Sequence, residues 1–207
     1  MNDKLFPFHK QPSADSILYR YFTIEKLLDF LLESRISLVR LNNFEDKLEG
    51  MTLEHLKLNL LSDEISNKFI NEIPSLNFIS LNVNPKSRNN LRRKRDMFQN
   101  LNYATCWYIN NHESVAMWQL YSNPNSVAIR ISHEKLVNEI KNSNFKISNS
   151  NFNKISYGCI DYYQFNDIEK IYKIDIKKDV AGFIKDLSFA HENEFRIMFE
   201  VNEEDKI

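Results

Sequence analysis

Charged side chains recur between apolar ones in the segment FAHENEFRIMFEV, residues 189–201. This alternation predicts a β-strand with one buried face, because successive side chains of a strand point to opposite sides. Glu192, Glu194 and Arg196 then share the second face, with about 7 Å between neighbours. Such a row is either a solvated sheet face or the floor of a site, in which a carboxylate stabilises developing positive charge and the arginine binds an anion.

Two further arginines stand among apolar residues of predicted strands. Arg20 lies in ILYRYF (17–22) and Arg40 lies in RISLVRL (35–41), each on the same strand face as its apolar neighbours. A guanidinium keeps its charge in a protein, so each arginine needs a carboxylate partner or an anionic ligand. One interpretation is structural, with Asp or Glu partners across the sheet; the other is a site for a ligand phosphate.

Aromatic residues offer a surface for a planar ligand. Trp118 and Tyr121 lie one turn apart on a helix predicted over 112–122, and Trp107 lies on the preceding predicted strand. Such rings stack on nicotinamide and adenine, and packing in the core is the alternative. The other candidate site residues are Asp46, Glu49, Glu113, Lys185 and His191.

A basic segment, RNNLRRKR at 88–95, places five positive charges on a predicted helix. This segment could contact a phosphate backbone, form a solvated helix face, or face the acidic surface of a partner. The whole chain has 27 basic and 28 acidic residues, so its net charge of −1 gives no reason to expect nucleic acid or an anionic membrane. The five histidines are scattered through the sequence, and we expect no metal site.

Glycine and cysteine are scarce. Three glycines are too few for the glycine-rich loops that hold phosphates in Rossmann and P-loop proteins. Two cysteines, Cys106 and Cys159, imply no disulfide framework and favour a reducing compartment. The sequence also lacks an apolar run of roughly 18 residues and the pattern of a signal peptide, so we expect a cytoplasmic protein without membrane contact.

The predicted strands and helices that carry these candidate residues alternate irregularly along the chain. This order predicts an α+β fold, one domain over residues 1–207, with a mixed, mostly antiparallel sheet flanked by helices and an irregular N-terminal arm at 1–15. Besides the closing strand, the predicted strands cover 17–22, 35–41, 76–83, 102–109, 127–131 and 155–165. The predicted helices cover 23–34, 51–73, 85–100, 112–122, 133–142 and 176–190.

Five segments follow one another in a recognisable order: LYRYF, LNNFEDKLEG, ATCWYINNHESVAMWQLYS, VAIRI and FIKDLSFAHENEFRI. Together they resemble a widespread bacterial group, the domain-of-unknown-function family twenty-nine seventy-one, over roughly residues 17–201. The specific parts of this resemblance are the W-x-x-Y motif at 118–121 and the closing H-E-x-E-x-R motif at 191–196. In a stretch similar to N-D-P-x-E, Lys47 stands where the family has proline.

The layout is also similar, more distantly, to that of the arginine–serine–glutamate ADP-ribosyltransferases. By that resemblance Arg20 holds a phosphate of NAD and Thr105 stands in place of the superfamily's S-T-S motif. Glu194 stabilises the oxocarbenium-like centre as nicotinamide leaves, and Glu192 orients the acceptor. The resemblance implies NAD as substrate without a metal, a nucleotide, protein or nucleic acid as acceptor, and a role as a toxin or phage-defence component.

The predicted site thus has Glu194 and Glu192 as catalytic residues. The predicted NAD-binding residues are Arg20, Tyr21, Arg40, Trp118 and Tyr121. Two alternatives stand beside this prediction. One is a non-catalytic binding module whose arginines and glutamates, Arg196 included, form a structural network; the other is a nucleic-acid-binding protein that uses residues 88–95. The sequence predicts no oligomeric state.

Overall fold

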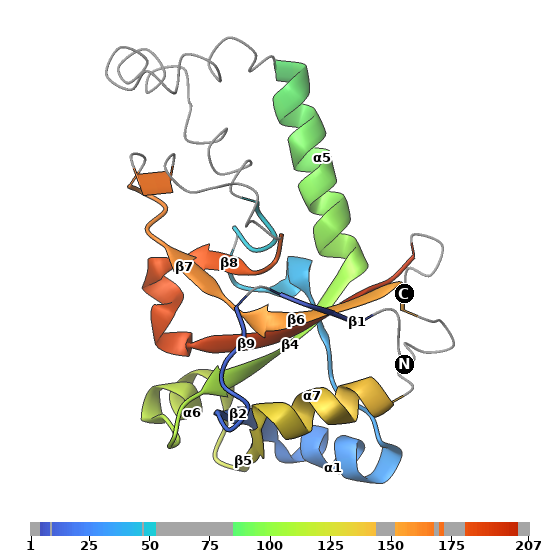
Figure 1. Ribbon diagram of the computed structural model, residues 1–207, viewed down its shortest axis with the longest axis vertical. Helices are drawn as coiled ribbons and strands as arrows, with labels where there is room; N and C mark the ends of the chain where they lie inside the picture. The colour runs from blue at the N-terminus through green and yellow to red at the C-terminus, as the bar shows by residue number, and fades with distance from the viewer. Residues whose placement is uncertain are drawn as a thin grey trace.

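The computed structural model of the protein describes residues 5–8, 10–46, 48–52, 85–143, 152–167, 170–171 and 181–202. The helix predicted over 51–73 lies outside these residues except for its first two, and the strand predicted over 76–83 lies wholly outside them. In the described part, helices flank a mixed, mostly antiparallel sheet, so the predicted α+β fold is confirmed (Figure 1).

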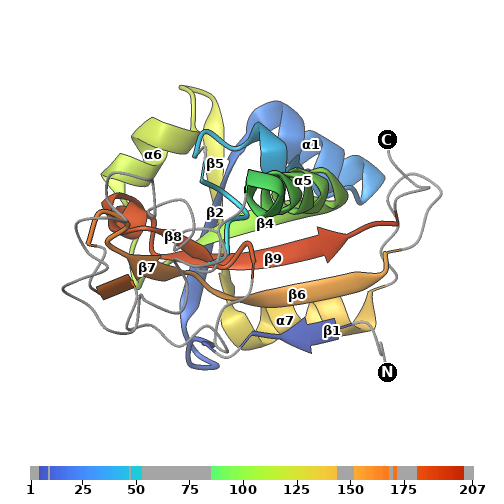
Figure 2. The same ribbon diagram turned by 90° about the horizontal axis from the view of Figure 1, so that it is seen from above.

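Seven strands form the main sheet of the described chain, in the order β1-β6-β9-β4-β2-β5, with β3 paired to β4. Their bounds are β1 Leu5–Pro7, β2 Ile17–Thr23, β3 Val39–Arg40, β4 Asn102–Ile109, β5 Ser126–Ser132, β6 Lys154–Cys159 and β9 Glu194–Glu200. All pairs are antiparallel except β1 with β6. Strands β7 Asp161–Tyr163 and β8 Ile184–Asp186 form a separate parallel pair. The late strand β9 therefore lies at the centre of the sheet (Figure 2).

Strand register divides the side chains of this sheet between two faces. Paired residues point the same way, so Phe195 of β9 shares a face with Trp107 of β4, and Glu194 shares the opposite face with Tyr108. We call the first the α7 face, because helix α7 (His133–Asn142) packs on it, and the second the charged face. All side chains of β9 from Glu194 to Phe199 are buried, so the row of charges is not a solvated sheet face.

Helices cover both faces. Three of them are α1 Ile24–Glu33, α5 Pro85–Leu101 and α6 Val115–Tyr121, and two short 3-10 helices are η1 Leu41–Asn43 and η4 Leu187–Glu192. Helix α7 buries Leu136, Val137 and Ile140 in the larger apolar core on the α7 face. Helix α6 packs Met117 against tyrosines of β2 and β4 on the charged face. None of the described helices combines the length and the apolar character needed to cross a lipid bilayer.

The predicted helix over 176–190 is wrong for the residues that the structure describes. Residues 184–186 form β8, which pairs with β7, and η4 follows directly. The side chain of Asp186 accepts a hydrogen bond from the backbone N–H of Ser188 and so caps η4. Pairing with β7 thus outweighs the helical periodicity of the segment, and it moves Glu192 out of the closing strand into η4.

Other predicted strands are shorter than expected. Of residues 35–41 only Val39–Arg40 pairs in the sheet. The strand predicted over 155–165 divides after Cys159, because the backbone N–H of Asp161 bonds to the carbonyl of Phe183 and starts the pairing with β8. The segment 1–15, expected to be irregular, contains β1.

Candidate functional site

A buried ionic network occupies the charged face, with Arg196 at its centre. The guanidinium is fully buried and donates to both carboxylate oxygens of Glu49, at 2.6 and 3.1 Å. It also donates to both oxygens of Glu194, at 2.6 and 3.2 Å, and to the carbonyl of Gly182 at 2.5 Å. These five bonds use all five N–H donors of an arginine, so Arg196 has none left for a ligand.

Lys185 continues the network toward the surface. Its ammonium donates to Glu194 at 2.9 Å and to Glu192 at 2.5 Å. The hydroxyl of Tyr121, a residue that is 48% exposed, donates to the other oxygen of Glu192 at 2.6 Å. The chain of contacts thus leads from a fully buried arginine to an exposed tyrosine on α6.

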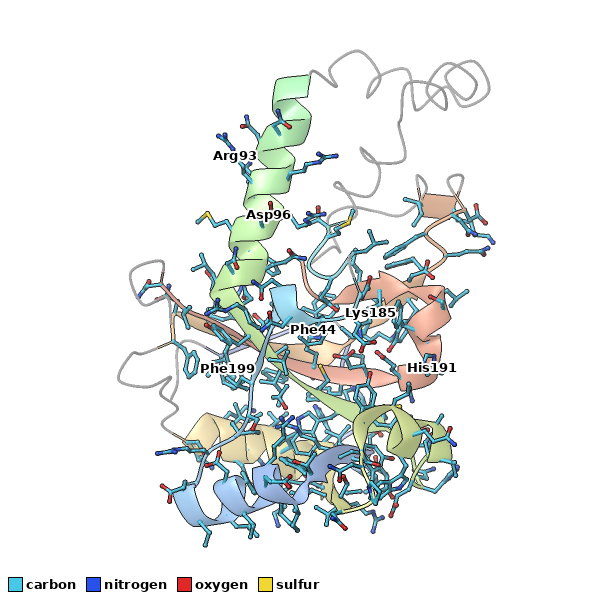
Figure 3. The ribbon with its side chains drawn as sticks, turned by 180° about the vertical axis from the view of Figure 1, so that it is seen from behind. Phe44, Arg93, Asp96, Lys185, His191 and Phe199 are labelled. Atoms are coloured by element: carbon cyan, nitrogen blue, oxygen red, sulfur yellow. The ribbon has the colours of Figure 1, made fainter. Side chains whose placement is uncertain are left out.

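The local fold explains how these charges meet. Glu49 follows a turn in which the side chain of Asp46 accepts a hydrogen bond from the N–H of Leu48, at 2.8 Å. Lys185 stands on β8, while Glu192 ends η4 and is joined to β9 by Asn193 in the left-handed region, with φ of 36°. The ring of Phe44 lies 5.3 Å from the guanidinium carbon of Arg196 and 5.9 Å from the Lys185 nitrogen. Figure 3 shows Phe44 and Lys185 beside each other.

The network fixes the ionisation of its members. Burial alone would raise the pKa of Glu194, but the charges of Arg196 and Lys185 outweigh it and hold this pKa well below its usual range. Burial alone would lower the pKa of Lys185, but the charge of Glu194 outweighs it and raises this pKa. Burial is the main reason that the pKa of the neighbouring Cys106 thiol is raised, so this cysteine is neutral near pH 7. Glu194 and Lys185 therefore stay charged near pH 7 and are paired with each other.

Arg20 lies on the other side of the sheet. Its strand neighbour Leu18 pairs with Ile109, which places Arg20 on the α7 face, away from Glu194. The guanidinium lies 4.7 Å from the ring of Phe22 and 5.8 Å from that of Trp107. The structure thus separates the two residues that the predicted NAD site would combine.

The Arg20 guanidinium has few polar partners. Nη2 donates to the carbonyl of Ser37 at 2.5 Å, whereas Nη1 is buried and has no hydrogen-bond partner. Within the described ranges, no Asp or Glu forms an ion pair with Arg20. Burial lowers the pKa of Arg20 to about 10, so the group still carries its charge at neutral pH.

Residues of β4 surround Arg20 and extend its site. Trp107 and Thr105 point to the same face, and the Trp107 Nε1–H and the Thr105 Oγ1 are buried without partners. Next along this face, Arg40 donates to the hydroxyl of Tyr103 through Nε at 3.0 Å and through Nη2 at 2.5 Å. The guanidinium groups of Arg20 and Arg40 and the unpartnered hydroxyl of Thr105 therefore all lie on the α7 face.

The predicted aromatic residues meet on the charged face. The rings of Tyr21 and Trp118 pack edge to face, with centroids 4.9 Å apart. Trp118 Nε1 donates to Glu113 at 2.8 Å, and the Tyr21 hydroxyl accepts from the N–H of Ser114 at 3.2 Å. Together with Tyr121, these contacts fix α6 against β2 and η4 rather than forming a site with Arg20.

His191 lies apart from both groups. It is exposed, and its Nδ1 contacts the carbonyl of Ser188 at 3.0 Å within η4. Figure 3 shows it on the outer side of the molecule.

Sequence reasoning missed the pairing of Glu49 with Arg196 and of Lys185 with Glu192 and Glu194. It grouped Arg20 and Arg40 with them instead, because all these residues stand on predicted strands. It also missed Tyr103 as the partner of Arg40. The alternation of residues 17–22 puts Arg20 on the same strand face as Leu18 and Phe22. This could have separated Arg20 from Glu194, but the sequence alone does not show that the two residues lie on opposite faces of the sheet.

The comparisons with known proteins agree with the family resemblance. Residues 117–197 match the family model described as "Protein of unknown function (DUF2971)". Searches of the curated proteins and of the solved structures gave no significant match. The matched range begins on α6 and ends in β9, so it contains the W-x-x-Y motif and the closing H-E-x-E-x-R motif. Residues 117–197 are therefore similar to the DUF2971 family.

Proposed function

We propose that this chain is a binding module for a small anionic ligand of the phosphate class, anchored by Arg20, and that the ionic network of the charged face is a structural brace. One observation carries the proposal. Arg20 is partly buried, no carboxylate of the described residues forms an ion pair with it, and its buried Nη1 has no hydrogen-bond partner. A buried donor without a partner costs about 1–3 kcal/mol.

An oxyanion would supply the missing partner. Arg20 offers the two N–H groups of Nη1, which have no partner, and Trp107 and Thr105 offer an indole N–H and a hydroxyl on the same sheet face. Arg40 adds a second positive charge farther along the same face. Segment 34–38, which lacks regular secondary structure, contacts Arg20 through Ser37, so entry of a ligand requires this segment to move. The donor set suits a phosphate better than a cation or an apolar molecule.

Nucleotides are natural carriers of such a group, and NAD is the nucleotide that the sequence resemblance implies. Transfer of ADP-ribose would further require Glu194 to reach the ligand. Both oxygens of this glutamate already accept hydrogen bonds from Arg196, its side chain is 3% exposed, and it lies on the face opposite to Arg20. The arrangement therefore supports binding more strongly than transfer.

Titration calorimetry with phosphate, ADP-ribose and NAD tests the proposal. We expect at least one of these ligands to bind, and Arg20→Gln to weaken that ligand at least about tenfold, as loss of a charged hydrogen bond does. Arg130→Gln is the matched control, because Arg130 is exposed on the adjacent strand β5. Equal affinity in wild type and Arg20→Gln, with both folded by circular dichroism, would contradict the proposal.

A second assay separates binding from transfer. Purified protein is incubated with NAD and cell lysate, and free nicotinamide and labelled product are measured for the wild type and Glu194→Gln. We expect neither product from either protein. Nicotinamide release that is lost in a folded Glu194→Gln variant would instead favour the ADP-ribosyltransferase-like activity, because removal of such a carboxylate costs about 10²–10³ in rate.

A further inference from the structure

The two edges of the main sheet differ in how they are protected. The edge strand β1 has three residues and ends in Pro7, which lacks a backbone donor. The opposite edge strand, β5, has seven residues, Ser126–Ser132, in continuous register with β2. It contains no proline or lysine and one charged residue, Arg130. Proteins normally protect a long edge strand against pairing with another chain by prolines, lysines and other charges, and of these β5 has only Arg130.

The outer side of β5 also has no partner within the described chain. Its ladder hydrogen bonds join it to β2, and no other backbone hydrogen bond of residues 126–132 reaches a strand. On the α7 face beside it lies α1, which buries none of its residues and leaves Leu28 48% exposed. On the opposite face lies α6, with Leu120 56% exposed. Both views show α1, β5 and α6 together at one side of the molecule (Figures 1 and 2).

The sequence of β5 identifies the partner. SVAIRIS reads nearly the same in both directions about Ile129. If two copies pair antiparallel about this residue, serine faces serine at both ends, Val127 faces Ile131, and Ile129 faces itself. Arg130 then faces Ala128, so the two positive charges are not directly opposed. A symmetric interface needs a surface that is complementary to itself, and β-branched residues opposite each other stabilise antiparallel pairs.

We infer that β5 is the dimerisation edge of this protein: two copies pair their β5 strands antiparallel about Ile129 and join their sheets. The side chains of Val127, Ile129 and Ile131 lie on the α7 face, since they pair with Phe22, Arg20 and Leu18. Pairing therefore extends the apolar core of each copy across the two-fold axis. This inference is independent of the proposed anion site, because it concerns the free edge of β5.

The mass of the full chain in solution is the first test. Sedimentation equilibrium at about 100 μM should give a dimer, whereas a monomer at this concentration overturns the inference.

Ser126→Asp with Ser132→Asp places like charges opposite each other at both ends and should weaken dimerisation at least about tenfold. Aspartate can keep the cap of α7 that Ser132 provides, and circular dichroism checks that the change at Ser126, whose hydroxyl bonds to Asn123, leaves each variant folded. Ser126→Lys with Ser132→Asp restores opposite charges and should dimerise; failure of this charge swap in a folded variant contradicts the pairing.

Crosslinking tests the register. A short bis-maleimide should join two copies of Ile129→Cys, because this position faces itself. Val127→Cys is the matched control: its counterpart is Ile131, so two such cysteines lie roughly 14 Å apart along the strands. Wild type controls for Cys106 and Cys159. Equal crosslinking of both variants, or a dimer in which Ile129→Cys does not crosslink, would overturn the register and the inference.

Discussion

At the scale of single residues, Arg196 decides whether the charged face is stable. Its guanidinium is fully buried between two glutamates, and a buried charge is tolerated only when its partners and hydrogen bonds are complete. Of the predicted row, Glu194 and Arg196 share one face of β9, whereas Glu192 lies in η4. Alternation in the sequence shows which residues share a face, but it does not show what covers that face.

Replacement of Arg196 tests the brace. Arg196→Met leaves Glu49 and Glu194 buried without their cation and should cost about 3–5 kcal/mol in free energy of unfolding. Urea denaturation measures this cost. Arg92→Met, at an exposed arginine of α5, should change the free energy by less than about 0.5 kcal/mol. A loss in Arg196→Met as small as in this control would mean that the network is not a brace.

The pKa of Glu194 predicts a dependence of stability on pH. Its folded pKa lies below the ordinary value of 4.5, because Arg196 and Lys185 outweigh the effect of burial. The folded state therefore gains stability from this carboxylate above about pH 4.5, and the gain is lost as the pH falls further toward the folded pKa. Between about pH 6 and 3, unfolding free energy should fall more steeply for wild type than for Glu194→Gln. Parallel curves would contradict the pKa shift.

At the scale of elements, local sequence patterns correctly predicted those strands and helices that pair or pack along their whole length. Strand 102–109 and helix 133–142 occur within the predicted bounds. Helix α1 begins after Thr23, whose side chain accepts from the N–H of Lys26, as its cap residue predicts. The segment around Lys185 was missed because its conformation depends on β7, which comes 20 residues earlier, and no local signal carries that information.

Gly182 links β8 to the ionic network and gives an element-scale prediction. It has φ of 83°, its carbonyl accepts from Arg196, and an added Cβ would lie 2.8 Å from the sulfur of Met198. Gly182→Ala should therefore cost about 1–3 kcal/mol in unfolding free energy, from backbone strain and from a displaced carbonyl. Urea denaturation measures it, with Leu187→Ala, at an exposed position, as the control. An unchanged midpoint in Gly182→Ala would show that β8 accommodates the change.

Helix α5 tests the nucleic-acid alternative. Its basic residues 92–95 are consecutive, so they point around the helix at about 100° intervals rather than along one stripe. Arg95 also bonds to Asp96 at 3.0 Å, and Figure 3 shows Arg93 and Asp96 on the same helix. We expect no retention on DNA or RNA columns above about 0.15 M salt. Strong retention that falls when Arg92, Arg93 and Arg95 are reversed to Glu would favour nucleic-acid binding.

At the scale of the whole molecule, one sheet separates two groups of charges. Arg20 and Arg40 lie on the α7 face, and the network around Glu194 lies on the charged face, with no partner shared between Arg20 and Glu194 in the described contacts. Strand order brings β2 and β9 to either side of β4, so these residues are close in topology but point in opposite directions. An anion site and a brace can therefore coexist without acting on the same ligand.

This separation predicts that the two groups act independently. The loss of unfolding free energy in the double variant Arg20→Gln with Glu194→Gln should equal the sum of the single losses within about 0.5 kcal/mol, because residues without shared partners rarely couple. Glu194→Gln alone should cost about 1–3 kcal/mol and leave affinity for the anion unchanged. Arg20→Gln should weaken that affinity at least about tenfold and should not lower stability, since Arg20 lacks an ionic partner to leave unpaired and its Nη1 is unsatisfied. Urea denaturation and calorimetry on the four proteins measure both quantities. Strong coupling, or loss of anion binding in Glu194→Gln, would mean that both residues act on one ligand and would favour the ADP-ribosyltransferase-like arrangement.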